Sequence, residues 1–218
     1  MIKGCIFDLD GVIVDTAKFH YKSWRNIALE LGGDLSEEEN EKLKGVSRMG
    51  SLEFILDLNN ISITAEEKVE LAAKKNDRYL ELIQDIDQSE MLPGVLDFIK
   101  LLHKENYKIG LGSASRNAIT IIKKLNVDHY FEAQVDGNMV TKSKPDPEVF
   151  LKGASGLNLN PTDCVVFEDS IKGISAANQA GFISVGVGNE TTLSSADYVI
   201  QGFQGLIPSE LFKLLSSN

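Results

Sequence analysis

The second part of the chain alternates between short apolar runs and stretches with helical spacing, and this alternation restricts the fold more than any other feature. We expect strands over residues 108–113, 133–135, 164–168, 183–187 and 197–200. The helical patterns cover residues 94–104, 116–125, 146–157 and 170–180. Alternation of this kind is typical of a parallel sheet with helices on both faces. The sequence therefore predicts an α/β protein with a doubly wound parallel sheet.

One further strand is expected far from the others in the chain. Residues 1–7 are mostly apolar, as expected for a short strand buried in a parallel sheet. From about residue 17 to residue 90 there is no convincing strand, and helical spacing covers residues 19–31, 49–58 and 64–83. Helix starts are also marked by capping-box pairs, Ser36 with Glu39 and Thr64 with Glu67.

These patterns predict a core with an inserted second domain. The first strand must join the later sheet, so the helical block between them is an insertion. We expect an α/β core of residues 1–15 and 93–218, with Pro93 and Gly94 marking the return of the chain to it. We expect residues 16–92 to form an all-helical cap over the carboxyl ends of the strands, where open parallel sheets bind ligands.

Composition and charge exclude several classes of partner. The chain has 218 residues and a formal net charge of −10, whereas nucleic acids and anionic membranes require a basic face. It lacks an apolar run long enough for a membrane span and a basic start typical of a secretion signal. Cys5 and Cys164 lie in apolar runs and are expected to be buried, reduced thiols. We expect a cytoplasmic monomer that binds neither nucleic acid nor membrane.

The first predicted strand ends at Asp8-Leu9-Asp10-Gly11. Side chains two residues apart in an extended chain point the same way, so Asp8 and Asp10 would share one pocket. Two carboxylates at the end of a central strand are costly unless a cation or a reaction requires them. The plainer interpretation is an acidic turn, because Asp and Gly are common turn residues.

Further polar segments follow other predicted strands or lead into helices. Ser113 ends the strand over residues 108–113, and its hydroxyl with flanking N–H groups could hold a phosphoryl oxygen. Lys144 precedes Pro145 in a turn before a helix. Taken alone, these segments could be a helix cap and a solvated lysine. Glu168 and Asp169, which end an apolar strand, suit a hard divalent cation better than packing.

Together and in this order, the segments resemble the motifs of the haloacid dehalogenase-like phosphotransferase superfamily, whose core is Rossmann-like. The resemblance implies that Asp8 is a nucleophile that forms an aspartyl-phosphate, and that Asp10 is the general acid and base. It also implies that Ser113 binds the transferring phosphoryl group, which Lys144 neutralises. The implied Mg²⁺ ligands are Asp8, the backbone carbonyl of Asp10, Glu168 and Asp169.

These implied roles agree with the chemistry of the residues. A carboxylate can accept a phosphoryl group covalently, and a neighbouring carboxyl group can transfer protons if its pKa is raised. Phosphoryl transfer needs charge neutralisation and in-line positioning more than elaborate covalent chemistry.

The cap segments over residues 16–20, 43–48 and 74–77 resemble the β-phosphoglucomutase family, in which the corresponding positions close over a hexose bisphosphate. The resemblance implies that Arg48 holds the phosphate that is not transferred, Lys75 orients the sugar and His20 supports Asp10, with Thr16 at the hinge. Arg116 stands where the family usually has Lys, which keeps the charge but changes the geometry and number of donors. The implied substrate contacts are Thr16, Lys44, Gly45, Val46, Ser47, Arg48, Ser51, Lys75, Ser115, Arg116 and Asn117.

The resemblance therefore implies a Mg²⁺-dependent mutase that acts on hexose phosphates. It would convert β-glucose 1-phosphate to glucose 6-phosphate through an aspartyl-phosphate and β-glucose 1,6-bisphosphate. The alternative is a Mg²⁺-dependent phosphatase of the same superfamily that acts on a small sugar phosphate. A dehalogenase would need no acids like Glu168 and Asp169, and an idle binding protein would be expected to lack Asp8, Asp10, Lys144 or Asp169.

Overall fold

Short, almost fully apolar segments form one sheet in the computed structural model, which describes residues 1–216. The sheet has six strands in the order β3-β2-β1-β4-β5-β6, and every neighbouring pair is parallel. The strands are β1 (Gly4–Phe7), β2 (Lys108–Gly112), β3 (Ala133–Val135), β4 (Cys164–Glu168), β5 (Ile183–Val187) and β6 (Tyr198–Ile200). The predicted strands and their parallel arrangement are confirmed.

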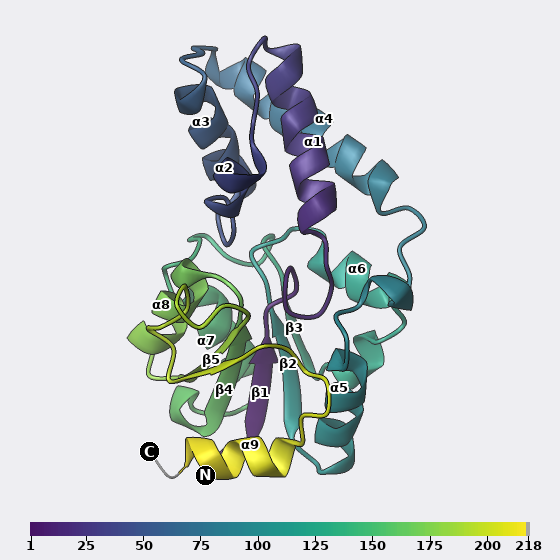
Figure 1. The fold of residues 1–218 in the computed structure, drawn as a ribbon, viewed down its shortest axis with the longest axis vertical. Coiled ribbons are helices and arrows are strands. Elements are labelled where there is room, and N and C mark those ends of the chain that lie inside the picture. The colour runs from purple at the N-terminus through teal and green to yellow at the C-terminus, as the bar shows by residue number, and fades with distance from the viewer. Residues whose placement is uncertain (217–218) are drawn as a thin grey trace.

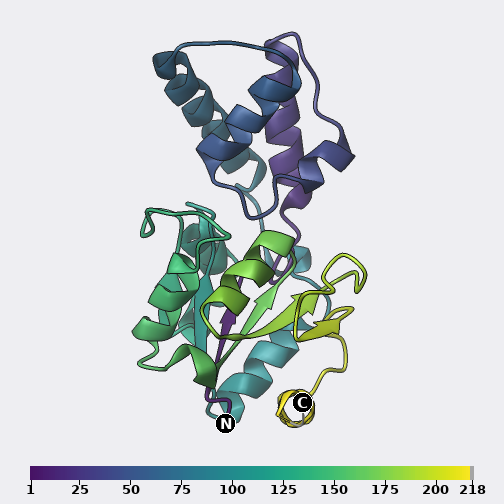
Figure 2. The ribbon, with the colours of Figure 1, turned by 90° about the vertical axis from the view of Figure 1, so that its left-hand side faces the viewer.

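Helices cover both faces of this sheet (Figures 1 and 2). Alternate residues of β1 point to opposite faces. Phe7 packs in one hydrophobic cluster with residues of α5 (Val95–Lys104), α6 (Ala118–Lys124) and α9 (Pro208–Leu215). Ile6 packs in a second cluster with residues of α7 (Glu148–Gly156) and α8 (Ile171–Gln179). Short 3-10 helices are η1 (Gln88–Glu90), η2 (Asp128–Tyr130) and η3 (Pro161–Asp163). The doubly wound architecture is confirmed.

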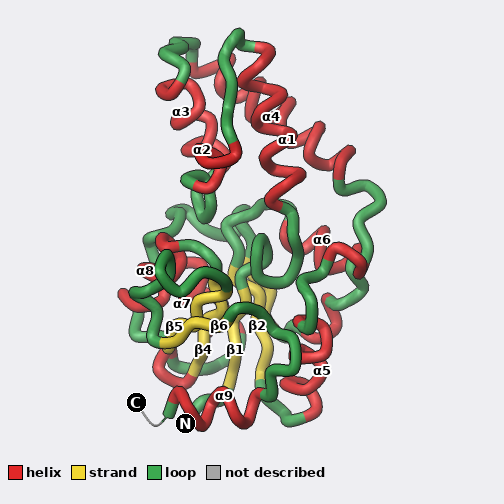
Figure 3. The backbone as a smooth tube through the Cα atoms, viewed as in Figure 1, coloured by secondary structure: helices red, strands yellow, loops and turns green. Residues whose placement is uncertain are grey.

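The inserted block forms a separate group of helices above the carboxyl ends of the strands, and Figure 3 shows no strand in it. These helices are α1 (Ala17–Glu30), α2 (Glu37–Glu41), α3 (Arg48–Leu58) and α4 (Ala65–Leu82). Trp24, Ile27, Leu52 and Ile55 are buried in a hydrophobic cluster of this group alone. Because it has a core of its own, we call the group the cap.

Two adjacent chain segments join the cap to the sheet and the helices on its faces, which together we call the sheet domain. The Asp15 N–H donates to Glu90 O at 3.0 Å, and the Leu92 N–H donates to Ile13 O at 2.9 Å. Val14 and Met91 form an isolated antiparallel bridge between these bonds. This pairing supports our proposal that the domain boundaries lie near residues 16 and 92.

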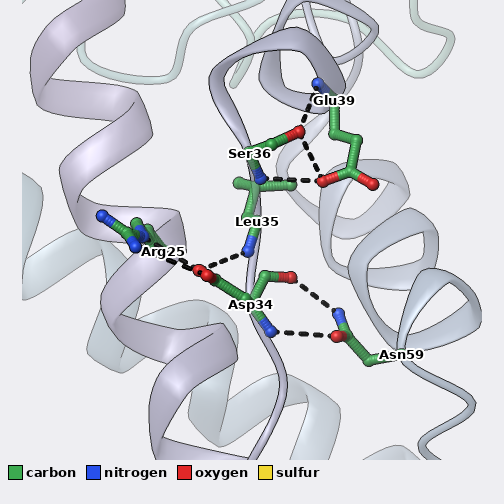
Figure 4. Close-up of polar contacts among 6 residues, drawn as sticks. All are labelled: Arg25, Asp34, Leu35, Ser36, Glu39 and Asn59. Atoms are coloured by element: carbon green, nitrogen blue, oxygen red, sulfur yellow. Dashed lines mark hydrogen bonds and ion pairs between the residues drawn. The ribbon is translucent and has the colours of Figure 1, made fainter.

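The loop between α1 and α2 is fixed by polar contacts (Figure 4). Ser36 and Glu39 form the predicted capping box at the start of α2. Asp34 accepts a hydrogen bond from Arg25 of α1 at 2.9 Å. Its backbone N–H donates to Asn59 Oδ1 at 2.9 Å, and Asn59 Nδ2 donates back to Asp34 O at 3.0 Å. These bonds tie the loop to the end of α3 as well as to α1.

None of the helices within residues 1–216 is long and apolar enough to cross a membrane.

Candidate active site

The carboxyl ends of neighbouring strands bring three predicted site residues together. Asp8 follows β1, Ser113 follows β2, and Glu168 is the last residue of β4. Because β1 lies between β2 and β4, these side chains meet at one edge of the sheet. All three residues are buried, with 6%, 0% and 1% of their surface exposed. Polar groups buried to this degree need partners, since desolvation without one is costly.

Lys144 is the partner that the two buried carboxylates share. Its Nζ lies 2.7 Å from Asp8 Oδ1 and 2.7 Å from Glu168 Oε2. Burial raises the pKa of Asp8 well above its ordinary value, although the Lys144 charge opposes this effect. Burial alone would lower the pKa of Lys144, but the two carboxylates outweigh it and the pKa is raised. Lys144 is therefore a buried cation inside the site, not a solvated lysine at a helix start.

A third carboxylate completes an acidic cluster that can hold a metal ion. Oxygens of Asp8, Glu168 and Asp169 lie within 4.8 Å of one another. Burial and the nearby Glu168 charge raise the pKa of Asp169 to about 7. The Ser170 N–H and hydroxyl donate to Glu168 Oε1 at 3.1 and 2.5 Å. Hard oxygen ligands in this arrangement fit Mg²⁺, whose charge would offset the buried carboxylates.

Gly11 makes room for one of these carboxylates. Its φ is +81°, and a Cβ at this position would lie 2.2 Å from Asp169 Oδ2. Glycine adopts this backbone without strain and, having no Cβ, leaves the space open. An acidic turn explains Gly11, but it does not explain why Asp8 is buried against Lys144.

Asp10 contacts the first residues of the cap. Thr16 Oγ1 donates a hydrogen bond to Asp10 Oδ1, and His20 Nε2 lies 3.8 Å from the same oxygen. Burial raises the pKa of Asp10, while the Thr16 hydrogen bond opposes the rise. Burial also lowers the pKa of His20 well below its ordinary value, with help from the charges of Lys75 and Arg48. A carboxyl group with a raised pKa beside a neutral imidazole is suited to proton transfer.

Lys75 is buried between aromatic rings of the cap. It is 3% exposed, and its Nζ lies 4.9 Å from the centre of the Trp24 ring and 4.6 Å from that of Tyr79. The same nitrogen is 2.9 Å from His20 Nδ1. Burial and the nearby Arg48 charge lower the pKa of Lys75 to about 7. As an ammonium group Lys75 can only donate, so His20 Nδ1 would accept and Nε2 would carry the proton towards Asp10.

A second group of polar side chains joins the cap to the loop before α6. Asn76 Oδ1 accepts hydrogen bonds from Arg48 Nη2 of α3 at 2.7 Å and from Asn117 Nδ2 of the sheet domain at 3.0 Å. Burial and the Arg116 charge lower the pKa of Arg48, so these two cations lie near each other. Two guanidinium groups beside amide donors can bind a phosphate group.

The cap and the sheet domain enclose a cavity of about 280 Å³ between these groups. Among the predicted site residues, the cavity is lined by Asp8, Asp10, His20, Lys44, Gly45, Val46, Ser47, Arg48, Ser51, Lys75, Ser113, Ser115, Arg116, Asn117, Lys144 and Asp169. The other two predicted site residues contact this lining, since Thr16 bonds to Asp10 and Glu168 bonds to Lys144. The structure therefore brings together residues from both domains that are far apart in the sequence.

Several residues of the site were not among the predicted ones. Trp24, Met49 and Val140 line the cavity but carry no group that suggests chemistry. Asn76 adjoins Lys75 in the sequence, and Lys142 lies two residues before Lys144. The signal for Asn76 is the family resemblance of the segment over residues 74–77, and the signal for Lys142 is its proximity to Lys144.

Known proteins with similar sequences and structures include enzymes of sugar phosphates. A family model for haloacid dehalogenase-like hydrolases matches residues 2–181. The chain is 43% identical over 202 residues to a β-phosphoglucomutase of Bacillus subtilis, which covers 92% of this chain and 89% of the relative. It is 34% identical over 185 residues to a fructose-1-phosphate phosphatase of Escherichia coli, covering 84% and 95% of the two chains. The crystal structure of β-phosphoglucomutase from Clostridium difficile is similar with a TM-score of 0.96 at 42% identity, covering 100% of this chain and 98% of that one.

Proposed function

We propose that this chain, which belongs to the haloacid dehalogenase-like hydrolase family, is a mutase that converts β-glucose 1-phosphate into glucose 6-phosphate. The observation that carries the proposal is a cavity with two separate cationic groups. Lys144 lies beside Asp8 in the sheet domain, and Arg48 lies beside Arg116 between the two domains. A sugar with a phosphate at each end matches two such groups, whereas one phosphate needs a single group.

Asp8 is the group that would carry the phosphoryl unit between the two sugar oxygens. The phosphorylated enzyme binds β-glucose 1-phosphate, and the 6-hydroxyl oxygen attacks the phosphorus of phospho-Asp8. The phosphorus–Asp8 bond breaks while Asp10 accepts the hydroxyl proton, and β-glucose 1,6-bisphosphate forms. After the bisphosphate turns around, an Asp8 oxygen attacks the phosphorus of the 1-phosphate. The bond from phosphorus to the C1 oxygen of the sugar breaks, and this oxygen takes the proton back from Asp10, which yields glucose 6-phosphate and phospho-Asp8.

The other side chains would bind the transferring phosphoryl group, neutralise its charge and orient Asp10. Lys144 would contact the charge of the transferring group from its position 2.7 Å from Asp8. Ser113 would bind the same group, and Thr16 would hold the Asp10 carboxyl group. The proposed Mg²⁺ ligands are Asp8, Glu168, Asp169 and the Asp10 carbonyl. When bound, Mg²⁺ would supply positive charge to the oxygens of the transferring phosphoryl group.

The remaining phosphate would lie between Arg48 and the loop before α6. Ser115, Arg116 and Asn117 of that loop line the same cavity. Because Arg48 belongs to the cap and Asn117 to the sheet domain, a phosphate held by both would keep the domains closed. Lys75, fixed by His20, would face the sugar.

A coupled assay tests this proposal directly. Purified protein receives β-glucose 1-phosphate, Mg²⁺ and a catalytic amount of glucose 1,6-bisphosphate, and glucose 6-phosphate is measured with its dehydrogenase. We expect steady formation of glucose 6-phosphate with the β-anomer and none above background with the α-anomer. Absence of product from both anomers would contradict the proposal.

A phosphatase is the second candidate, since one relative at 34% identity is a fructose-1-phosphate phosphatase. It would use the same Asp8 chemistry, with water in place of the second sugar oxygen. Release of inorganic phosphate without glucose 6-phosphate in the assay would favour it.

A further inference from the structure

Lys44 of the cap reaches into the acidic cluster of the sheet domain. Its Nζ lies 3.1 Å from Asp169 Oδ2, and Asp169 is one of the three clustered carboxylates. The same ammonium group lies 3.0 Å from Glu41 Oε2 of α2, within the cap. The Asp169 side chain is 8% exposed and that of Lys44 is 33% exposed, so this ion pair lies at the edge of the cavity. Lys44 thus has one partner in each domain.

The backbone next to Lys44 also lies against the sheet domain. A Cβ at Gly45 would be 3.0 Å from Ser170 Oγ and 3.7 Å from Lys144 Cδ. The φ of Gly45 is +70°, a conformation that glycine adopts without strain. The contact between Lys44 and Asp169 is therefore made by a loop whose backbone also packs against the sheet domain, and does not depend on one flexible side chain alone.

Each lysine near the cluster pairs with different carboxylates of it. Lys144 lies between Asp8 and Glu168, and Asp169 has no comparable contact with it. Lys44 is the cation that pairs with Asp169 across the domains. A divalent cation held by the three carboxylates would neutralise the charge that attracts Lys44.

We propose that Lys44 opposes metal binding: it holds the cap on the sheet domain through Asp169 while the carboxylate cluster lacks Mg²⁺, and Mg²⁺ releases it. After release, Lys44 keeps its ion pair with Glu41 within the cap. The inference rests on the Mg²⁺ site of the proposed function. Coupling between two equilibria is reciprocal, so a contact that Mg²⁺ weakens must itself weaken Mg²⁺ binding. Lys44 would therefore make the substrate-free protein more closed and its Mg²⁺ affinity lower.

Lys44→Met and Lys42→Met separate this effect from a general change in charge. Lys42 is exposed, lies two residues away and forms the C-cap of α2. Mg²⁺ affinity is measured by isothermal titration calorimetry without substrate. We expect Lys44→Met to bind Mg²⁺ about fivefold more tightly, at the lower end of typical coupling factors because Lys44 is partly exposed. Lys42→Met is expected to match the wild-type protein.

Small-angle X-ray scattering measures cap opening independently of metal affinity. Without Mg²⁺, we expect a larger radius of gyration for Lys44→Met than for the wild-type protein and Lys42→Met. Added Mg²⁺ should increase the radius of the wild-type protein and leave that of Lys44→Met unchanged. Lys44→Arg, which keeps the charge, should behave like the wild-type protein.

The two measurements distinguish failure of the inference from failure of the metal site. Equal Mg²⁺ affinity and equal radius for Lys44→Met and Lys42→Met would overturn the role of Lys44, and so would weaker Mg²⁺ binding by Lys44→Met. Lack of Mg²⁺ binding by the wild-type protein would contradict the proposed metal site. The scattering comparison without Mg²⁺ would still decide whether Lys44 holds the cap closed.

Discussion

At the scale of single residues, the site depends on charged side chains that are buried together. Asp8, Lys144 and Glu168 are at most 6% exposed, and each is stable there because the others are present. Removing one member of such a group leaves an unpaired buried charge. Because desolvating charges costs free energy even when they are paired, such a group is seldom kept without a function, which supports its assignment as the reacting centre.

Asp8→Asn is expected to reduce mutase turnover by at least about a thousandfold, because an amide oxygen is a poor nucleophile towards phosphorus. The coupled glucose 6-phosphate assay measures the loss, and circular dichroism checks the fold. A folded variant that retains a substantial fraction of wild-type turnover would show that Asp8 is not the nucleophile.

Gly11→Ala is expected to destabilise the protein more than Gly32→Ala, although φ is +81° at both positions. A left-handed backbone costs an alanine about 1–2 kcal/mol in either case. At Gly11 the new Cβ would also lie 2.2 Å from Asp169 Oδ2, whereas nothing lies within 4 Å at Gly32. Urea unfolding measures the difference, and Mg²⁺ titration should show weaker binding for Gly11→Ala alone. Equal effects of both substitutions would argue against the close approach of Gly11 and Asp169.

Some site residues could be predicted from their position at a strand end, others only from family resemblance, and some from neither. Asp8 and Glu168 end apolar strands, and parallel topology brings such ends together, so their proximity follows from the sequence pattern. Arg48 and Lys75 were identified by family resemblance, since a charged residue on a helix is usually solvated. Asn76 lies in the segment over residues 74–77 that resembles the family, but no role was predicted for it. Its contacts depend on how the cap meets the sheet domain, which no local pattern encodes.

At the scale of elements, the strands and most helices follow from periodicity, and their ends follow from caps. Thr64 and Ser36 begin α4 and α2 as their capping boxes predict. The C-terminal helix α9 is absent from the predicted helices. It has Pro at its first position and is only eight residues long. Leu211 and Phe212 are buried in the hydrophobic cluster that also contains residues of α5 and the sheet, so tertiary packing stabilises a helix whose short pattern is weak evidence by itself.

The helix α4 contains a lysine whose burial makes the cap sensitive to pH. Besides the Trp24 and Tyr79 rings, Lys75 lies beside His20 of α1. Burial and the charge of Arg48 lower the pKa of Lys75, and the charge of Asp10 raises it. Its pKa is lowered from 10.5 to about 7 in the folded protein. Between these pH values the unfolded chain binds more protons than the folded one, so stability rises with pH by at most about 1.4 kcal/mol per unit. Below about pH 7 both states are protonated and this dependence ends.

Lys75→Met is expected to remove this dependence. The free energy of unfolding of the wild-type protein, relative to the variant, should rise by up to about 2–3 kcal/mol from pH 7 to pH 9. Urea unfolding at pH 7, 8 and 9 measures it. Lys74→Met, which removes the same charge at the neighbouring exposed position, serves as the control. A difference between wild type and Lys75→Met that stays constant with pH would contradict the burial of a titrating amine.

At the scale of the whole molecule, the function depends on two domains that meet over one cavity. The sheet domain supplies Asp8, Ser113 and Lys144, and the cap supplies Arg48 and Lys75. A phosphatase and a mutase of this family would share the first group. They differ in what happens to the aspartyl-phosphate, because a mutase must exclude water while the bisphosphate turns around. In the proposed mutase, closure of the cap on the second phosphate would provide that exclusion.

The partition between the two products should therefore depend on the cap. With primed β-glucose 1-phosphate, we expect the wild-type protein to form glucose 6-phosphate far faster than inorganic phosphate. Arg48→Ala removes a charge-assisted contact worth roughly 2–5 kcal/mol, so it should lower mutase activity and increase the phosphate released per glucose 6-phosphate formed. Hydrolysis of acetyl phosphate, which has no second phosphate, should change little. If mutase activity and acetyl phosphate hydrolysis fell equally, Arg48 would support the fold or the transfer step itself, and water exclusion would have to come from elsewhere in the cap.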